Sequence, residues 1–153
     1  MPDERQQDEF TVSTDPHRLD LDAIHAALTT SYWSEGIPRE TVERALRGSL
    51  CFGLYVLAGR AGSGERQIGL ARVVTDAATF AYLCDVYVLP EFRGRGLGKL
   101  LMQAVTEHPD LQGLRRFSLV TQDAHGLYRQ FGFTEIRSPD RHMEIVRPDL
   151  YKR

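Results

Sequence analysis

This 153-residue sequence has only two cysteines and one tryptophan, no long apolar run and little excess of one charge. Its two cysteines, Cys51 and Cys84, both fall in expected strands and show no metal-ligand spacing to other cysteines or histidines, so we interpret them as buried, reduced thiols. No apolar run approaches the ~20 residues of a membrane span. The formal net charge of −2 gives no overall basic field, which argues against nucleic acid as a partner.

What is present is the composition of an ordinary globular protein, with 42% hydrophobic and 26% charged residues. The first nine residues, MPDERQQDE, are polar and charged. We therefore expect residues 1–9 to be a disordered leader and residues 10–153 to form a single domain. The leader has no signal-peptide core, so the cytoplasm is the expected compartment. We expect neither a metal cofactor nor a membrane partner.

The stretch from Leu83 to Met102, LCDVYVLPEFRGRGLGKLLM, carries the strongest signal in the chain. A short, β-rich apolar run predicts a strand buried on both faces, and Pro90 ends it because proline cannot donate to a sheet ladder. A glycine-rich turn follows, and apolar residues at helical spacing then predict an amphipathic helix. The turn and the start of the helix consist of Arg93, Gly94, Arg95, Gly96, Leu97, Gly98 and Lys99.

This strand, turn and helix together have the chemistry of an anion site. The first N–H groups of a helix lack internal partners and the helix dipole is positive there, while glycines let an anion approach the backbone. Arg93, Arg95 and Lys99 add full positive charges. The unit predicts a phosphate or pyrophosphate ligand; the simpler alternative is a turn with a solvated basic face.

The spacing distinguishes between phosphate-binding motifs. The dinucleotide fingerprint G-x-G-x-x-G fails because Lys99 stands where its third glycine belongs, and the P-loop fails because leucine follows the lysine. The segment instead resembles the acetyl-CoA-binding motif of the GNAT N-acetyltransferase superfamily, [QR]-x-x-G-x-[GA], which Arg93, Gly96 and Gly98 match. A second segment, residues 126–133 (GLYRQFGF), is similar to that superfamily's A-x-x-[LF]-Y-x-x-x-G-F.

The resemblance implies a fold of the α/β (α+β) class, with a mixed, mostly antiparallel central sheet of about six to seven strands flanked by four helices. The periodicity along the chain is consistent with this and predicts the order β, α, α, β, β, β, α, β, α, β, β. In that order, residues 59–66 form a hairpin turn, and two strands, 133–136 and 142–146, close the sheet as a last hairpin.

The resemblance also implies acetyl-CoA as co-substrate, with its pyrophosphate in the anion site. Backbone groups near Val86, Tyr87 and Val88 would then bind the pantetheine arm like an added strand, and an N–H there would polarise the acetyl carbonyl. Asp123 stands where many members carry an asparagine that contacts the cofactor, so that position lacks the amide donor.

Tyr128 matches the tyrosine that commonly serves as general acid in the superfamily. The chemistry agrees, since free thiols have a pKa of about 8.5 and tyrosine of about 10, so a neutral phenol can donate a proton to the departing sulfur. The alternative is a half-buried aromatic side chain that fills the core beside Phe131 and Phe133.

Asp85 is the charged residue inside the strand before the turn, and a buried acid needs a partner or a function. One interpretation makes it the general base that deprotonates the amine, directly or through water. The other pairs it with a basic side chain or a helix N-terminus. Strict alternation would place Asp85 on one face with Leu83 and Tyr87, opposite Cys84 and Val86.

The acceptor pocket in this fold usually lies between the first two helices and the sheet, where Tyr32 and Trp33 offer cation–π contact to an amine. We therefore predict an acyltransferase that moves an acetyl group from acetyl-CoA to the primary amine of a small molecule, by direct attack in a ternary complex. A protein N-terminus or lysine is the alternative acceptor, and a non-catalytic acyl-CoA-binding sensor is the alternative class. A homodimer is a further partnership that we consider.

Overall fold

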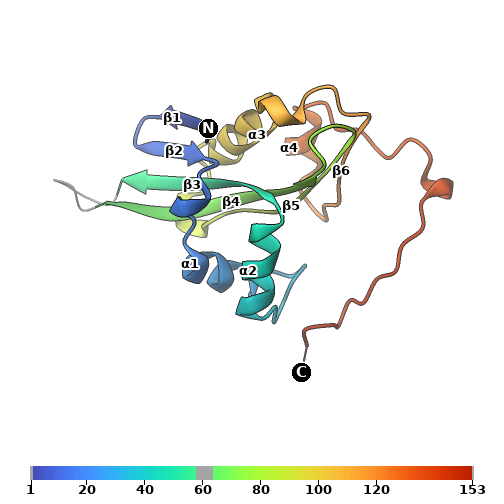
Figure 1. Ribbon diagram of the computed structural model, residues 1–153, viewed down its shortest axis with the longest axis horizontal. Helices are drawn as coiled ribbons and strands as arrows, with labels where there is room; N and C mark the ends of the chain where they lie inside the picture. The colour runs from blue at the N-terminus through green and yellow to red at the C-terminus, as the bar shows by residue number, and fades with distance from the viewer. Residues whose placement is uncertain (1, 58–63, 153) are drawn as a thin grey trace.

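The computed structural model describes residues 2–57 and 64–152. A six-stranded sheet in the order β1-β2-β3-β4-β5-β6 forms its centre (Figure 1). Neighbouring strands are antiparallel, except that β5 and β6 are parallel. The strands are β1 (Glu4–Gln7), β2 (Phe10–Ser13), β3 (Leu50–Leu57), β4 (Glu65–Thr75), β5 (Phe80–Val88) and β6 (Arg116–Leu119). The helices are α1 (Leu21–Leu28), α2 (Arg39–Arg47), α3 (Leu97–Glu107) and α4 (His125–Arg129).

Helices cover both faces of the sheet (Figure 1). α3 packs on one face, where its apolar stripe, including Leu101 and Val105, joins strand residues such as Phe52 and Ile68 in the larger core. α1 and α2 lie on the other face and form a smaller core around Ile24. The expected mixed α/β fold, with a mostly antiparallel sheet and four helices, is confirmed.

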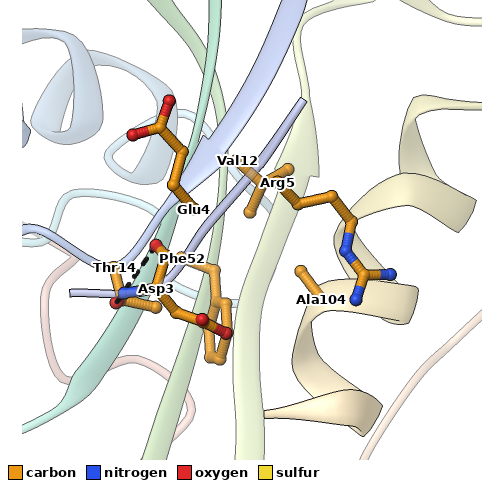
Figure 2. A pocket seen from close by; sticks show the side chains of 7 residues that line it. All are labelled: Asp3, Glu4, Arg5, Val12, Thr14, Phe52 and Ala104. Atoms are coloured by element: carbon orange, nitrogen blue, oxygen red, sulfur yellow. Dashed lines mark hydrogen bonds between the residues drawn. The ribbon is translucent and has the colours of Figure 1, made fainter. Parts of the chain in front are cut away.

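The expected disordered leader, residues 1–9, is wrong at residues 4–7, because Glu4–Gln7 forms β1. A turn at Asp8, whose φ is 54°, folds this strand back onto β2 in antiparallel pairing. The Asp3 N–H donates to Thr14 Oγ1 at 2.6 Å and closes the far end of the hairpin (Figure 2). The sequence concealed this strand because an edge strand pairs through its backbone while its side chains stay polar and exposed.

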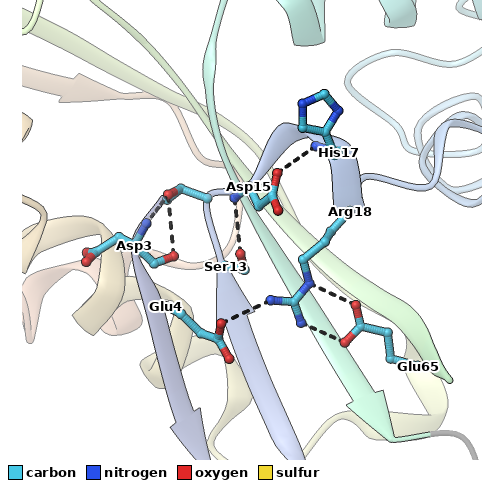
Figure 3. Close-up of polar contacts among 8 residues, drawn as sticks. Asp3, Glu4, Ser13, Asp15, His17, Arg18 and Glu65 are labelled. Atoms are coloured by element: carbon cyan, nitrogen blue, oxygen red, sulfur yellow. Dashed lines mark hydrogen bonds and ion pairs between the residues drawn. The ribbon is translucent and has the colours of Figure 1, made fainter. Parts of the chain in front are cut away.

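Charged side chains fasten this hairpin to the rest of the fold. The Arg18 guanidinium donates two hydrogen bonds to Glu65 of β4, at 2.9 and 2.7 Å, and reaches Glu4 of β1 at 3.3 Å (Figure 3). Arg5 extends toward α3 and forms an ion pair with Glu107 (Figure 2). The cavity between the hairpin and α3, of about 10 Å³, has room for about one water at most, so we assign it no ligand.

The last expected hairpin is wrong, since neither 133–136 nor 142–146 is a strand. Residues 134–152 instead follow α4 as a largely extended segment that bows away from the sheet on the β6 side (Figure 1). β6 is therefore an edge of the described sheet. The expected hairpin turn at 59–66 lies mostly outside the described residues. None of the described helices is long and apolar enough to cross a membrane.

Candidate active site

The glycine-rich turn leaves β5 through the short 3-10 helix Pro90–Phe92 and begins α3. Gly94 and Gly96 adopt φ angles of 82° and 74°, in the left-handed region that costs other residues about 1–2 kcal/mol. A Cβ at either glycine would meet nothing within 4 Å, so the backbone conformation, and not the space, requires glycine. Gly96 is the N-cap of α3 and supplies no side-chain cap, which leaves the first N–H groups of this eleven-residue helix open to an anion.

A cavity of about 260 Å³ lies against this turn. Its lining joins β5, the turn, α3 and α4, and consists of Val88, Phe92, Arg93, Gly94, Gly96, Leu97, Gly98, Lys99 and Leu127. The Arg93 Nε–H donates to the Val88 carbonyl at 3.1 Å, and the Arg95 guanidinium stacks 5.6 Å from the centroid of Phe92. Phe92 and Leu127 also line the cavity and were not predicted as site residues; Phe92 directly precedes the motif, whereas only the folded chain brings Leu127 beside it.

β5 has a free edge where it approaches the turn. Its parallel pairing with β6 ends at Leu83, opposite Leu119, although β5 continues to Val88. Beyond that point the outer edge of β5 has no partner strand among the described residues. Unpaired backbone groups of this kind can bind an extended chain as if it were a further strand.

The backbone of β5 alternates between this free edge and β4. The Leu89 N–H donates to the Ile68 carbonyl of β4 at 2.8 Å. By alternation, Val86 and Val88 present their N–H groups to the free edge, whereas Tyr87 presents its own to β4. Among the three residues expected to bind the pantetheine arm, Val86 and Val88 therefore direct their backbone groups to the free edge, and Tyr87 directs its own to β4.

A β-bulge interrupts β5 near the start of this edge. Asp85 and Val86 together oppose a single residue of β4, and Asp85 has a φ of 53°. The expected alternation is wrong across the bulge: Leu83 and Val86 both contact the α3 core, and Asp85 is directed to the α1–α2 side, as Tyr87 is. Period-two counting failed because the bulge inserts one extra residue.

Asp85 is held by two donors. Arg72 Nε–H donates to Oδ2 at 2.7 Å, and Trp33 Nε1–H donates to Oδ1 at 2.8 Å. The side chains of Arg72 and Asp85 are only 18% and 10% exposed, and Arg72 also donates to Ser49 Oγ at 2.9 Å. Burial lowers the pKa of Arg72, but the charge and the hydrogen bond of Asp85, together with the nearby Cys84 and Cys51, raise it overall. Of the two alternatives for Asp85, the structure contains the ion pair with a basic side chain. Arg72 is likewise a charged residue inside an apolar strand, and the sequence analysis did not single it out.

Tyr128 lies in α4 with only 8% of its surface exposed, and its ring packs edge-to-face on Phe133 at 6.0 Å. Burial, followed by the nearby Tyr32 and Asp123, raises the pKa of Tyr128 to about 12, so the phenol is protonated at neutral pH. The hydroxyl has no hydrogen-bond partner among the described residues, yet it is not one of the fully buried unpaired atoms. Tyr128 therefore has a buried ring and an accessible, protonated hydroxyl group.

The α1–α2 loop closes the other side of this site. Tyr32 and Trp33 are exposed and pack edge-to-face at 5.0 Å. The Tyr32 hydroxyl accepts a hydrogen bond from the Gln122 N–H at 3.3 Å, in the loop that leads from β6 to α4. The exposed Asp123 follows directly. The sequence could not show that this loop and the start of α4 face each other, since 90 positions separate the bonded pair.

Comparison with known proteins decides the family. The acetyltransferase (GNAT) domain matches residues 52–135, which is more than half of the chain. The chain belongs to the GNAT acetyltransferase family. A curated relative, the acetyltransferase-class protein FG08082 of Gibberella zeae, is 39% identical over 149 residues, covering 86% of this chain and 83% of that protein.

Solved structures agree with this GNAT assignment. A protein of Xanthomonas campestris pv. campestris assigned to the GNAT family is 52% identical, with a TM-score of 0.88, and the match covers 94% of this chain and 97% of that one. An acetyltransferase-class protein of Clostridium acetobutylicum, solved with acetyl-CoA, shares the fold at 15% identity and a TM-score of 0.60; the match covers 95% of this chain and 96% of that one.

The GNAT match begins at residue 52 and so divides the site into two parts. The turn, its cavity, the free edge of β5 and Tyr128 lie inside the matched span, whereas Tyr32 and Trp33 lie before it. The turn side of the site thus lies in the part of the chain that the GNAT domain matches, and the α1–α2 loop lies before that part. Among the described residues, no cluster of three or more histidine, cysteine or acidic side chains is placed to hold a metal ion.

Proposed function

We propose that this GNAT enzyme transfers the acetyl group of acetyl-CoA to the primary amine of a small molecule, by direct attack within a ternary complex. The observation that carries this proposal is one of adjacency. Val88, at the free edge of β5, and Leu127, the neighbour of Tyr128, line the same cavity as the glycine-rich turn. The anion site at the turn, the free edge of β5 and the Tyr128 side chain therefore lie one after another along the same cavity. The Clostridium acetobutylicum structure carries acetyl-CoA on this fold and supports the choice of co-substrate.

The turn binds the pyrophosphate in this proposal. The open N–H groups at the start of α3 donate to its oxygens, and Arg93, Arg95 and Lys99 supply positive charge. Val86 and Val88 pair with the pantetheine amides along the free edge. An ionised Asp123 accepts hydrogen bonds and repels phosphate, so we place it near a pantetheine N–H and away from the turn.

The proposed acetyl transfer forms one bond, between nitrogen and carbon, and breaks another, between carbon and sulfur. The amine nitrogen attacks the thioester carbon, and a β5 N–H, from Val86 or Val88, stabilises the negative oxygen that develops. As the carbon–sulfur bond breaks, Tyr128 donates its proton to the sulfur, so that free coenzyme A leaves as a thiol. The nitrogen releases its extra proton, which restores the phenol. Cys51 and Cys84 play no part as acyl carriers, since burial raises the pKa of Cys51 to about 12 and that of Cys84 to about 11.

Asp85 holds the acceptor loop in this proposal. Its two carboxylate oxygens already accept from Arg72 and Trp33, so it positions the indole against the amine site. The role of general base stays the competing hypothesis, because a water molecule could still carry a proton to one of these oxygens. The two roles predict different pH–rate profiles for a substitution at Asp85.

Tyr32 and Trp33 form the acceptor wall. Their exposed, perpendicular rings offer π faces to a cationic or amine group, and the bonds to Gln122 and Asp85 fix both rings in place. A wall of only two aromatic side chains suits a compact amine better than a folded protein surface. A peptide N-terminus or lysine is the alternative that the acceptor screen includes.

The test is acceptor-dependent release of thiol. Purified protein is mixed with acetyl-CoA and a panel of small amines, N-terminal peptides and lysine peptides, and free thiol is measured continuously. We expect turnover with at least one small amine, and a fall of about 10²-fold or more in kcat for Tyr128→Phe with unchanged acetyl-CoA affinity by calorimetry. Binding of acetyl-CoA without turnover on any acceptor would favour the sensor, and peptide-only turnover would replace the substrate class.

A further inference from the structure

Arg72, in the middle of β4, has hydrogen-bonding groups that the fold only partly uses. A guanidinium carries five N–H donors. Nε–H donates to Asp85 Oδ2 at 2.7 Å, and Nη1 donates to Ser49 Oγ at 2.9 Å. No described residue accepts a hydrogen bond from Nη2, yet Nη2 is not one of the fully buried side-chain atoms that lack a partner. Nη2 therefore reaches solvent with two free donors, although the side chain as a whole is only 18% exposed.

This guanidinium lies on the α1–α2 side of the sheet, next to the acceptor wall. Arg72 and Trp33 donate to the two oxygens of one carboxylate, so the guanidinium and the indole lie on either side of Asp85. In the register of the sheet, Arg72 stands between Cys51 of β3 and Cys84 of β5. Cys51 packs in the smaller core with α1 and α2, whereas Cys84 is partly exposed. The solvent that reaches Nη2 therefore does so on the β5 side of this row.

The free donors are also close to the backbone groups of β5 that the proposed reaction uses. Arg72 is paired with Cys84, and Val86 follows Cys84 by two residues. Two residues of a strand span about 7 Å. A small molecule whose amine faces a thioester at Val86 can therefore place a second group on Nη2 of Arg72.

The chemistry of Nη2 selects what that second group is. A guanidinium only donates hydrogen bonds, and its planar N–H groups match the oxygens of a carboxylate. A second ammonium group would be repelled by the guanidinium, and an alkyl group would remove water from the N–H donors without replacing its hydrogen bonds. Because Asp85 offsets the charge of Arg72, the preference depends on direct hydrogen bonds and not on a long-range field.

We propose that Arg72 is a specificity-determining residue and that the acceptor is a small amino acid, whose carboxylate binds Nη2 while its amine faces the thioester. Tyr32 and Trp33 then contact the carbon skeleton between the two groups. This inference rests on the proposed acetyl transfer and narrows its substrate class. In the competing interpretation, Nη2 contacts only water and Arg72 serves the ion pair alone.

The experiment uses Trp33, the one tryptophan of the sequence, as a reporter beside Asp85. Its fluorescence is titrated in the presence of coenzyme A with pairs of compounds that differ by a single carboxylate: β-alanine and ethylamine, lysine and cadaverine, phenylalanine and phenethylamine. In at least one pair, we expect the carboxylated compound to bind the wild type about tenfold more tightly or better, the usual effect of a charge-assisted hydrogen bond. Thiol release from acetyl-CoA with the same pairs should give the same preference in kcat/KM.

Arg72→Lys tests the assignment to this side chain. Lysine keeps a positive charge for Asp85 but lacks the Nη2 group, so the two members of the preferred pair should bind within about threefold of each other. The matched control is Arg18→Lys. Arg18 is also ion-paired and only 24% exposed, but its partner Glu65 lies at the other end of β4, so this variant should keep the preference. Circular dichroism shows whether each variant is folded, and Arg72→Gln replaces Arg72→Lys if the latter is not.

Two results would overturn the inference. One is a wild type in which no carboxylated compound binds more tightly than its partner, or in which none changes the fluorescence. The other is a preference that survives unchanged in the Arg72 variant. Thiol release with amines but without a carboxylate preference would remove this inference and leave acetyl transfer in place. Carboxylate-dependent binding without thiol release on any acceptor would do the reverse, since it would support the site at Arg72 and exclude the proposed reaction.

Discussion

Substituting Asp85 by asparagine separates the two roles open to this residue and measures its ion pair. The change keeps the shape of the side chain but removes its charge. The amide oxygen can accept from Arg72 or from Trp33, but its NH₂ group must then face the other donor. Because the two charged side chains are only 18% and 10% exposed, Arg72 is left as a mostly buried cation without a counter-charge.

We expect Asp85→Asn to lower the free energy of unfolding by about 3 kcal/mol, the usual cost of breaking a buried ion pair from one side. The matched control is Asp22→Asn. Asp22 and Arg39 lie 2.6 Å apart, as closely as the buried pair, but their side chains are 82% and 53% exposed. Solvent screens such a pair, so this control should lose less than about 1 kcal/mol.

Urea unfolding followed by fluorescence gives both values, provided that the slope with denaturant is the same for each variant. Equal losses at the two positions would refute the reasoning, since burial is the main difference between the pairs. The pH–rate profile of the Asp85 variant then tests the role. A positioning residue leaves the shape of the profile unchanged and lowers kcat, whereas loss of a general base removes the limb that rises with pH.

Three further predictions concern other sites. Tyr55→Phe should raise the free energy of unfolding by about 1 kcal/mol in thermal melts, because the Tyr55 hydroxyl is buried with no hydrogen-bond partner among the described residues; a destabilised variant would contradict this. Gly96→Ala should cost about 1–2 kcal/mol and weaken acetyl-CoA binding in calorimetry, whereas Gly126→Ala, at a glycine without a positive φ, should do neither. Burial raises the pKa of Tyr128 to about 12, above the unfolded value of about 10, so its contribution to stability should hold below pH 10 and decline above it. The free energy of unfolding of Tyr128→Phe should therefore fall less steeply than that of the wild type as the pH rises above 10. The same slope in both proteins would exclude the effect.

The centre of the fold and the cofactor side of the site could be predicted from the sequence because their signals are local. A strand, a proline, glycines that need positive φ and an amphipathic helix follow one another within twenty residues, from Leu83 to Met102. Each of these signals depends on backbone geometry that a short segment decides for itself. The family assignment confirms the GNAT resemblance that these signals carried.

The errors fell where structure depends on distant partners. β1 has polar side chains, and only its pairing with β2 makes it a strand. The segment after α4 shows the opposite error. Residues 142–146 have the apolar pattern of a strand and were predicted as one, but they pair with no strand in the described chain. Asp85 was correctly grouped with Tyr87 but wrongly with Leu83, because strict alternation cannot anticipate a bulge. Its partners Arg72 and Trp33 are far apart in sequence.

The bulge at Asp85 connects these observations, because it affects both sides of the site. On the α1–α2 side it turns the carboxylate toward Trp33, and this bond holds the α1–α2 loop against the sheet. On the α3 side it keeps Val86 and Val88 in the core face of β5, in register with the turn that follows. The pairing of β5 with β6 ends at Leu83, just before the bulge, so the free edge begins where the local twist increases. A regular strand would direct Asp85 into the α3 core and leave the Trp33 indole without this bond, so one inserted residue shapes both the free edge of β5 and the position of the α1–α2 loop.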